Sequence, residues 1–295
     1  MNLFQRALAA ISMPTGRFPN ETAYSSLYSD IDFTYRYTDY EQLSCKSRTS
    51  FPCQSRMESA PQLRRPLEVV AKYRQYSLIA SLPKNSSSLA VKAEEAGADA
   101  IMLNIEGDEG STQNHFGGYD LHDIYINDAI SSVSIPCGIF IGGGKQLSEE
   151  YWERIMSSSF GFVDMYAHLM PLFVLSDPRV KKICSISTGY ILEQVSQLSK
   201  MEGVDAIDVA TVAPQARGSP FSALDYATLG VITNLSEKPL LLRTQKKLTR
   251  SDITKVMELG VKGLVADPCI LTGADEAYKD ELASLSPKRL PVEEH

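Results

Sequence analysis

The segment PLLLRTQKKLTRSDITKVMELGVKGLVAD, residues 239–267, contains one complete structural unit. It opens with an apolar run, continues with a stretch of helical pattern that ends at Gly260, and closes with a second apolar run. Short continuous apolar runs are typical of parallel strands that are covered on both faces, and a glycine after an amphipathic stretch is typical of a helix C-terminus. The segment therefore predicts a strand, a helix and a second parallel strand.

The same alternation extends upstream as far as Tyr76. The apolar runs are YSLIASL (76–82), DAIMLNI (99–105), IPCGIFI (135–141), GFVDMYA (161–167), KKICSIS (181–187), VDAIDVAT (204–211), PLLLRT (239–244) and GLVAD (263–267). Helical stretches lie between them, for example 86–97, which ends at a glycine, and 147–159, which begins with a serine cap. Eight strands that alternate with helices over about 240 residues predict a closed (β/α)8 TIM barrel. An open doubly wound sheet is the alternative, but it usually has fewer strands.

Composition excludes several classes of protein. The net charge of −7 and the pI near 5.2 argue against a nucleic-acid surface, which normally shows as a basic patch. No run of about eighteen apolar residues is present, so no transmembrane helix is expected. The five cysteines are scattered without a C-x-x-C pair, which favours reduced thiols in a cytoplasmic protein.

Residues 1–56 differ from the rest of the chain. They show no sustained period, are rich in Ser, Tyr and Thr, and carry too many acids for an organellar transit peptide. Our hypothesis is that Met57 is the natural start, that 1–56 is an upstream extension with little structure, and that 57–295 is the barrel. A genuine N-terminal arm or lid is the alternative.

A long polar segment follows the second expected strand. Connections in compact domains usually have about four to six residues, but the segment 106–120 is a loop of about fifteen. It carries Glu106, Asp108, Asn114 and His115. Because the active site of a TIM barrel lies at the carboxyl ends of its strands, we interpret the segment as a lid. Glu106 is a candidate base, and the other three are lid or substrate contacts.

Other strand ends also carry polar and charged residues. In chain order these are Ser81, Lys84, Asn104, Lys145, Asp164, Tyr166, His168, Ser185, Ser187, Asp208, Thr211, Arg217, Arg243, Lys246 and Asp267. Charges of both signs at one end of a barrel suit acid–base work on a polar or anionic substrate, with Asp208 and Arg217 as substrate contacts. Asp164 lies inside an apolar run, where an unpaired carboxylate is costly, and this predicts a lysine or arginine partner.

The sequence GGGK, residues 142–145, does not match the phosphate loop G-x-x-x-x-G-K-[ST]. Its glycines either let the third strand turn tightly or let the backbone approach a ligand. No spacing of His, Cys, Asp and Glu matches a standard metal site, so no metal is predicted, and a bound divalent ion is kept as an alternative. Cys269 is interpreted as a small buried cysteine rather than a nucleophile.

The last part of the chain, residues 238–277, resembles the closing segment of phosphate-binding barrels. The motif is MELGVKGLVADPCILTG, residues 257–273. In that superfamily the loop after the seventh strand and a short helix after the eighth bind a phosphate group, because helix N-terminal amides attract anions. The resemblance implies that phosphate binds the backbone of the last loop, with nearby cations supplying charge: Asp267, Pro268, Cys269, Ile270 and Thr272, with Arg243 or Lys246.

A narrower similarity is to N-acetylmannosamine-phosphate epimerases. The stretch AEEAGADAIMLNIEG, residues 93–107, resembles the second strand of that group, and 248–273 is similar too. Two features depart from the group. It places a catalytic lysine near the end of the third strand, where this chain has glycines before Lys145. The glycine-rich turn after the seventh strand is replaced by RTQKKL, residues 243–248.

These observations predict a cytoplasmic barrel enzyme that acts on a small phosphorylated metabolite by isomerase, epimerase or lyase chemistry. Glu106 or Asp164 is the expected base, and Lys145 or Lys84 the expected acid or oxyanion stabiliser. No cofactor is predicted. One alternative is an oxidoreductase that binds FMN at the same phosphate site. Another is a barrel without catalysis that binds a ligand or forms a homo-oligomer over the strand ends.

Overall fold

The computed structural model of the protein describes residues 76–109, 114–271 and 275–287. Within these ranges eight parallel strands close into one barrel, in the order β1-β10-β9-β8-β7-β6-β5-β2. The predicted TIM barrel is therefore confirmed, and the open sheet is not formed. The proposed extension 1–56 and its boundary at Met57 lie outside the described residues.

Each barrel strand falls inside the apolar run that predicted it. The strands are β1 (Ser77–Ser81), β2 (Ala100–Ile105), β5 (Cys137–Ile141), β6 (Phe162–Tyr166), β7 (Lys181–Ser187), β8 (Ala206–Ala210), β9 (Leu240–Arg243) and β10 (Gly263–Ala266). The residues of β2 and β5 are buried throughout, because both faces of each strand are covered.

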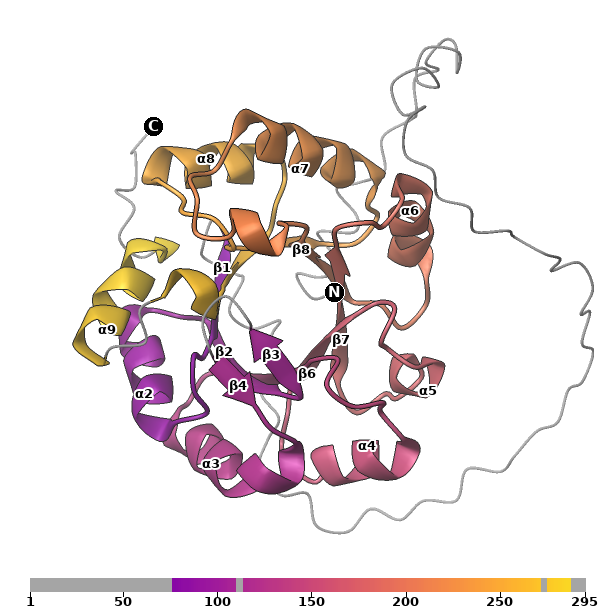
Figure 1. The fold of residues 1–295 in the computed structure, drawn as a ribbon, viewed down its shortest axis with the longest axis vertical. Coiled ribbons are helices and arrows are strands. Elements are labelled where there is room, and N and C mark those ends of the chain that lie inside the picture. Colours follow the sequence, from indigo (N-terminus) through magenta and orange to yellow (C-terminus); the bar gives the residue numbers. More distant parts are fainter. Residues whose placement is uncertain (1–75, 110–113, 272–274, 288–295) are drawn as a thin grey trace, which may run out of the picture. The chain divides into compact units, whose positions relative to one another are not determined.

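Helices surround the barrel (Figure 1). They are α2 (Ser87–Ala96), α3 (Tyr119–Ser132), α4 (Glu149–Ile155), α5 (Leu172–Leu175), α6 (Leu192–Lys200), α7 (Ala223–Leu235), α8 (Arg250–Glu258) and α9 (Asp275–Ser284). Local signals set their ends: Gly97 follows α2 with φ 98°, and the Ser148 hydroxyl caps α4 by accepting the Tyr151 N–H. In the part of the chain that the structure describes, no helix is long and apolar enough to cross a bilayer.

The barrel interior changes from apolar to polar along the strands. One layer is apolar and contains Ile79, Met102, Phe162, Ile183, Leu241 and Val265, with Ala206 packed against it. Strand side chains alternate between faces, so the next inward-facing position is two residues further on. Those positions are polar and buried: Ser81, Asn104, Asp164, Ser185, Asp208, Arg243 and Asp267. The sequence therefore builds a polar layer near the carboxyl ends of the strands.

The segment 106–120 is not a simple loop, which corrects its prediction. It contains an antiparallel hairpin of β3 (Gly107–Glu109) and β4 (Asn114–Phe116), and α3 already begins at Tyr119. Strands of three residues are too short to give a periodic signal, so the sequence did not reveal them. In the hairpin Asp108 is paired with His115, and Glu109 with Asn114. Its function as a lid stays a prediction.

Candidate functional site

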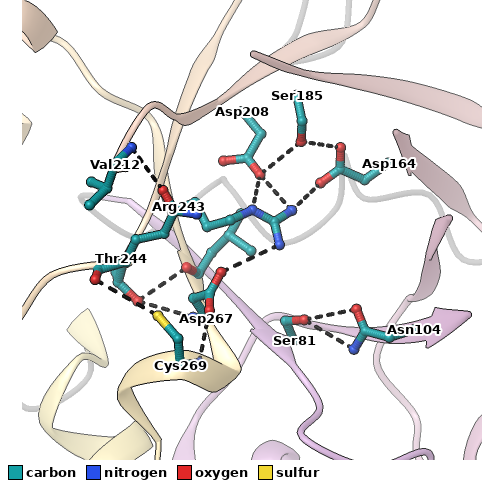
Figure 2. Close-up of polar contacts among 12 residues, drawn as sticks. Ser81, Asn104, Asp164, Ser185, Asp208, Val212, Arg243, Thr244, Asp267 and Cys269 are labelled. Carbon is teal, nitrogen blue, oxygen red and sulfur yellow. Dashed lines mark hydrogen bonds and ion pairs between the residues drawn. The ribbon is translucent and has the colours of Figure 1, made fainter. Parts of the chain in front are cut away.

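A buried ion network lies in the polar layer (Figure 2). Arg243, at the end of β9, is 3% exposed. Its Nη2 donates to Asp164 Oδ2 at 2.6 Å, and its Nε donates to Asp208 Oδ2 at 2.6 Å. Its Nη1 lies 3.8 Å from Asp267 Oδ2. The cationic partner predicted for Asp164 is thus confirmed, and three carboxylates from three different strand ends surround one guanidinium.

Ser185 joins the two closest carboxylates. Its hydroxyl lies 2.7 Å from Asp164 Oδ1 and 3.2 Å from Asp208 Oδ2. One hydroxyl has one proton, so it donates to one carboxylate at a time. Phe140 on β5 is level with Asp164 on β6, and its ring centroid lies 4.7 Å from Arg243 Cζ. An aromatic side chain therefore packs against the guanidinium.

Burial controls the protonation of the network. Burial raises the pKa of Asp164 above its usual value, against the attraction of Arg243, and the negative charge of Asp208 raises it further. Burial also raises the pKa of Asp208, again opposed by Arg243. For Arg243 burial acts to lower the pKa, but the surrounding carboxylates outweigh it and raise the pKa well above the usual value. Arg243 stays charged, and burial shifts the aspartate pair towards its protonated form.

The loop predicted to bind phosphate forms a short 3-10 helix, η3 (Pro268–Ile270). Its backbone amides already have acceptors in the chain. The Cys269 N–H donates to Asp267 Oδ1 at 2.8 Å, the Ile270 N–H to the Asp267 carbonyl at 3.2 Å, and the Leu271 N–H to the Pro268 carbonyl at 3.3 Å. A phosphate at these amides has to displace such bonds. Phosphate binding here stays a prediction.

Lys246 and Cys269, from the predicted phosphate set, and the predicted substrate contact Arg217 are all partly buried. Lys246 is paired with Asp225 at 2.6 Å, where Asp225 belongs to the capping box of α7. Cys269 is half-buried rather than buried, as the sequence had led us to expect. Its thiol lies 3.8 Å from the Gln245 carbonyl oxygen. Arg217 directly follows the 3-10 helix η2 (Pro214–Ala216) and is half-buried. Thr272 lies outside the described residues.

Glu106 lies outside the ion network, in a second cluster. Its Oε1 accepts a hydrogen bond from Tyr151 Oη at 2.8 Å, and the same Oη accepts the Tyr119 N–H at 2.6 Å. The ammonium of Lys145, which is exposed, lies 4.9 Å from the centroid of the Tyr151 ring. Burial raises the pKa of Tyr151 to about 12, partly offset by the Tyr119 amide and reinforced by Glu106. Tyr151 therefore stays neutral and holds the carboxylate of Glu106.

The backbone of Glu106 is also unusual. Its φ is 50°, and among the described residues it is the one non-glycine residue with positive φ. This conformation costs about 1–2 kcal/mol for a residue with a side chain. Such strain is found at functional sites more often than elsewhere, when surrounding contacts enforce it. Here the hydrogen bonds of the Glu106 N–H to the Gly117 carbonyl and of Tyr151 to the carboxylate enforce it.

The glycines of GGGK allow close approach of two backbones. Gly142 donates its N–H to the Ile105 carbonyl at 2.9 Å, and Gly144 donates to the Glu106 carbonyl at 2.8 Å. A Cβ at Gly142 would lie 2.4 Å from the Glu106 carbonyl oxygen, which no side chain tolerates. Gly142 and Gly144 therefore let the chain pack against the backbone of the strained Glu106.

Uncharged groups occupy the polar layer on the β1 and β2 side. The Asn104 side chain donates to the Leu82 carbonyl at 2.8 Å and contacts the Ser81 hydroxyl. Asn85 exchanges two hydrogen bonds with the Asn104 backbone. Lys84, in the same loop, is exposed. The polar layer is thus uncharged on this side, and the nearest lysine in the loop, Lys84, is at the surface.

The sequence-predicted residues therefore separate into groups. Asp164, Asp208, Arg243 and Asp267 lie together, and Glu106 lies with Lys145 around Tyr151. Sequence reasoning gave Tyr151 no role, because nothing in its helix pattern pointed to Glu106, 45 positions away. Over the described ranges, no group of three or more His, Cys, Asp or Glu side chains is placed to bind a metal ion.

Comparison with known proteins supports the fold. The sequence matches no protein-family model and none of the curated proteins. Among solved structures, the tryptophan synthase alpha-subunit of the hyperthermophile Pyrococcus furiosus is similar, with a TM-score of 0.53 and 12% identity, over 72% of this chain and 98% of that chain. The same subunit in a structure of the α2β2 complex has a TM-score of 0.54 and 13% identity over the same shares. At this identity the likeness establishes the barrel fold alone.

Proposed function

We propose that the protein is a barrel enzyme that transfers a proton on a small phosphorylated metabolite, by isomerase, epimerase or lyase chemistry. The observation that carries the proposal is the Asp164–Arg243–Asp208 network in the polar layer, with Asp164 and Asp208 at the third positions of β6 and β8 and Arg243 at the carboxyl end of β9. Active sites of TIM barrels lie at this end. A carboxyl group whose pKa burial raises is suited to general acid–base catalysis near neutral pH.

Within this proposal Asp164 gives and takes the proton, and Arg243 keeps Asp208 charged beside it. Asp208 Oδ1 is buried and has no hydrogen-bond partner among the described residues, so a donor group of the substrate fits there. Glu106 is the second candidate base, because Tyr151 and a strained backbone fix its carboxylate. Of the two exposed lysines predicted for this role, Lys145 lies in the Glu106 cluster and is the candidate acid or oxyanion stabiliser.

The phosphorylated substrate rests on the resemblance of 257–273 to phosphate-binding barrels. Arg243 is already paired with two carboxylates, and Lys246 with Asp225. Lys84 is exposed and follows β1, which is paired with β10, so its loop and the predicted phosphate loop follow neighbouring parallel strands. Within the proposal, Lys84 is therefore the cation that neutralises the phosphate group. The backbone of 267–270 contacts the phosphate oxygens.

A barrel that binds a ligand without catalysis is the second candidate. It is favoured by the closed network: Arg243 contacts the chain's own carboxylates, and the amides of η3 have acceptors within the chain. The similar alpha-subunit is part of an α2β2 complex, which supports assembly with other chains as an outcome of this alternative. Ligand binding without turnover distinguishes this candidate from an enzyme.

A thermal-shift titration of the full chain with inorganic phosphate tests the proposal, with chloride at matched ionic strength as control. A ligand at about 100 times its Kd stabilises a fold by about 2.7 kcal/mol, enough to raise Tm by a few degrees. We expect a phosphate-specific rise that is smaller in Lys84→Met and unchanged in Lys246→Met. A rise without turnover of any sugar phosphate would favour the second candidate. No rise in a folded sample would overturn the phosphorylated substrate.

A further inference from the structure

Four rings form a continuous series at one side of the barrel. The Phe140 and Tyr166 rings are 5.7 Å apart, edge to face at 85°. Tyr166 stacks with His168 at 5.8 Å and 29°, and His168 lies 5.9 Å from Tyr190. Aromatic pairs attract at centroid separations of about 4.5–7 Å, so each neighbouring pair is in favourable contact.

The series leads from the buried network to the solvent. Phe140 is 4% exposed and lies against the guanidinium of Arg243. Tyr166, at the end of β6, is half-buried, and His168, two residues further on, is exposed. The rings therefore lie along a path between the candidate proton-transfer group and the surface at the carboxyl ends of the strands.

The outer rings are fixed in place. The backbone N–H of His168 donates to Tyr190 Oη at 3.1 Å, and the ring atom Nδ1 of His168 lies 2.6 Å from the same oxygen. An exposed imidazole without such bonds would rotate freely. This one is held with its ring against Tyr166, as a binding surface for a flat group requires.

Exposed apolar side chains also follow β6 and β7. Leu172 is 71% exposed and follows β6 at the start of α5. Ile191 and Leu192 are 56% and 45% exposed and follow β7 at the start of α6. Single exposed apolar residues are ordinary, but these three belong to the two connections that also carry His168 and Tyr190. The β6 and β7 side of the site is thus both aromatic and apolar.

We propose that this side of the site binds a planar, apolar ring of a ligand, which packs against His168 and the edge of Tyr166. A ligand that carries such a ring and an anionic group would place the ring here and its polar part beside the network. The anionic part rests on the proposed function; the ring subsite stands without it. The chemical class is therefore an aromatic or heteroaromatic small molecule, and its phosphate ester where the proposed function holds.

The test compares phenyl phosphate with glycerol 1-phosphate, which share the anion and differ in the ring, on the full chain. Benzyl alcohol is the third probe, because it has the ring without the phosphate. Binding is followed by NMR on the imidazole C–H resonances of the four histidines, with His168→Asn to assign the relevant one. His122, which lies 6.5 Å from the Tyr125 ring on α3, is the internal control for unspecific contact.

We expect phenyl phosphate to bind roughly three- to tenfold more tightly than glycerol 1-phosphate. The His168 resonance should shift with both ring-bearing probes while that of His122 stays. Tyr166→Phe should keep the preference and Tyr166→Leu should lose it. Should Tyr166→Leu not fold, His168→Ala on the exposed side tests the same contact.

Equal affinity for the two phosphates, with no shift at His168 by any probe, would overturn the ring subsite and leave the phosphate proposal intact. A shift at His168 with benzyl alcohol, in a protein that binds neither phosphate, would support the ring subsite and overturn the phosphorylated substrate. Equal shifts at His168 and His122 would identify unspecific binding and overturn the subsite. The two proposals therefore fail independently.

Discussion

The two sides of the candidate site differ in how their charged side chains are buried and paired. On the β6 to β10 side, Asp164, Asp208 and Arg243 are almost completely buried and bound to one another. On the β1 to β5 side, Glu106 is half-buried with one tyrosine as partner, and Lys84 is exposed. A buried charge has to be paired because desolvation is costly, whereas a charge near water needs no ionic partner. The first side therefore governs stability and proton affinity, and the second carries charges that are in contact with solvent.

Removal of Arg243 should give the largest effect. Arg243→Met leaves the carboxylates of Asp164 and Asp208 buried without their cation, and breaking a buried pair typically costs about 3–5 kcal/mol. We expect a loss of unfolding free energy of that size in urea denaturation at pH 7. Lys246→Met, which breaks the less buried pair with Asp225, should cost about 1 kcal/mol or less. Equal losses in the two variants would contradict the contrast between the sides.

The pH dependence of stability should reveal the proton held by the aspartate pair. Because the folded-state pKa of Asp164 is raised, the folded protein binds more protons than the unfolded chain between the ordinary and the raised pKa. The stability that protonated Asp164 contributes is thus complete at low pH, and it is lost as the pH rises through the pKa of Asp164 in the folded protein. Asp164→Asn removes this loss. The Tm difference, variant minus wild type, should therefore increase from pH 5 to pH 9; parallel curves would refute a raised pKa.

Strain at Glu106 predicts a smaller effect on the other side of the site. Glu106→Ala loses the bond from Tyr151 and keeps the positive φ, whereas Glu106→Gly loses the same bond and relieves the strain. The glycine variant should be more stable than the alanine variant by about 1 kcal/mol in urea denaturation. An alanine variant as stable as the glycine variant would show that the backbone at 106 is unstrained.

The exposed lysines should give the smallest change in stability. Lys84→Met and Lys145→Met should alter the unfolding free energy by no more than about 0.5 kcal/mol, as is usual for surface substitutions. The effect of Lys84→Met should appear instead in binding, as a smaller rise of Tm with phosphate, and that of Lys145→Met in turnover. A loss of several kcal/mol in either variant would place that lysine in a structural role.

The barrel was predictable because each strand and several helix ends follow from local sequence. The apolar runs gave all eight strands, and Gly97 and Ser148 marked helix boundaries that the structure confirms. The hairpin β3–β4 was missed, because three-residue strands have no detectable period. The sequence predicted that Asp164 has a lysine or arginine partner, because a buried carboxylate needs a cation. It did not identify this partner as Arg243.

The site was predictable only in part. Asp164, Ser185, Asp208 and Arg243 each follow an inward-facing apolar residue by two positions, so strand alternation alone places them in one layer. The bond from Tyr151 to Glu106 depends on how α4 is rotated against the strands, which no local pattern contains. Nor does the sequence show that Arg243 is saturated by carboxylates, because this depends on side-chain geometry across β6, β8 and β9.

Solvent deuterium exchange tests the proposed proton transfer most directly. The full chain is incubated in D₂O with carbonyl-bearing sugar phosphates, including ribulose 5-phosphate and N-acetylmannosamine 6-phosphate, and C–H loss is followed by proton NMR. We predict exchange with at least one substrate, slower by about 100-fold or more in Asp164→Asn and unchanged in Lys246→Met. Exchange that is equally fast in Asp164→Asn, or no exchange above the enzyme-free rate with any of these substrates, would contradict proton transfer at this site.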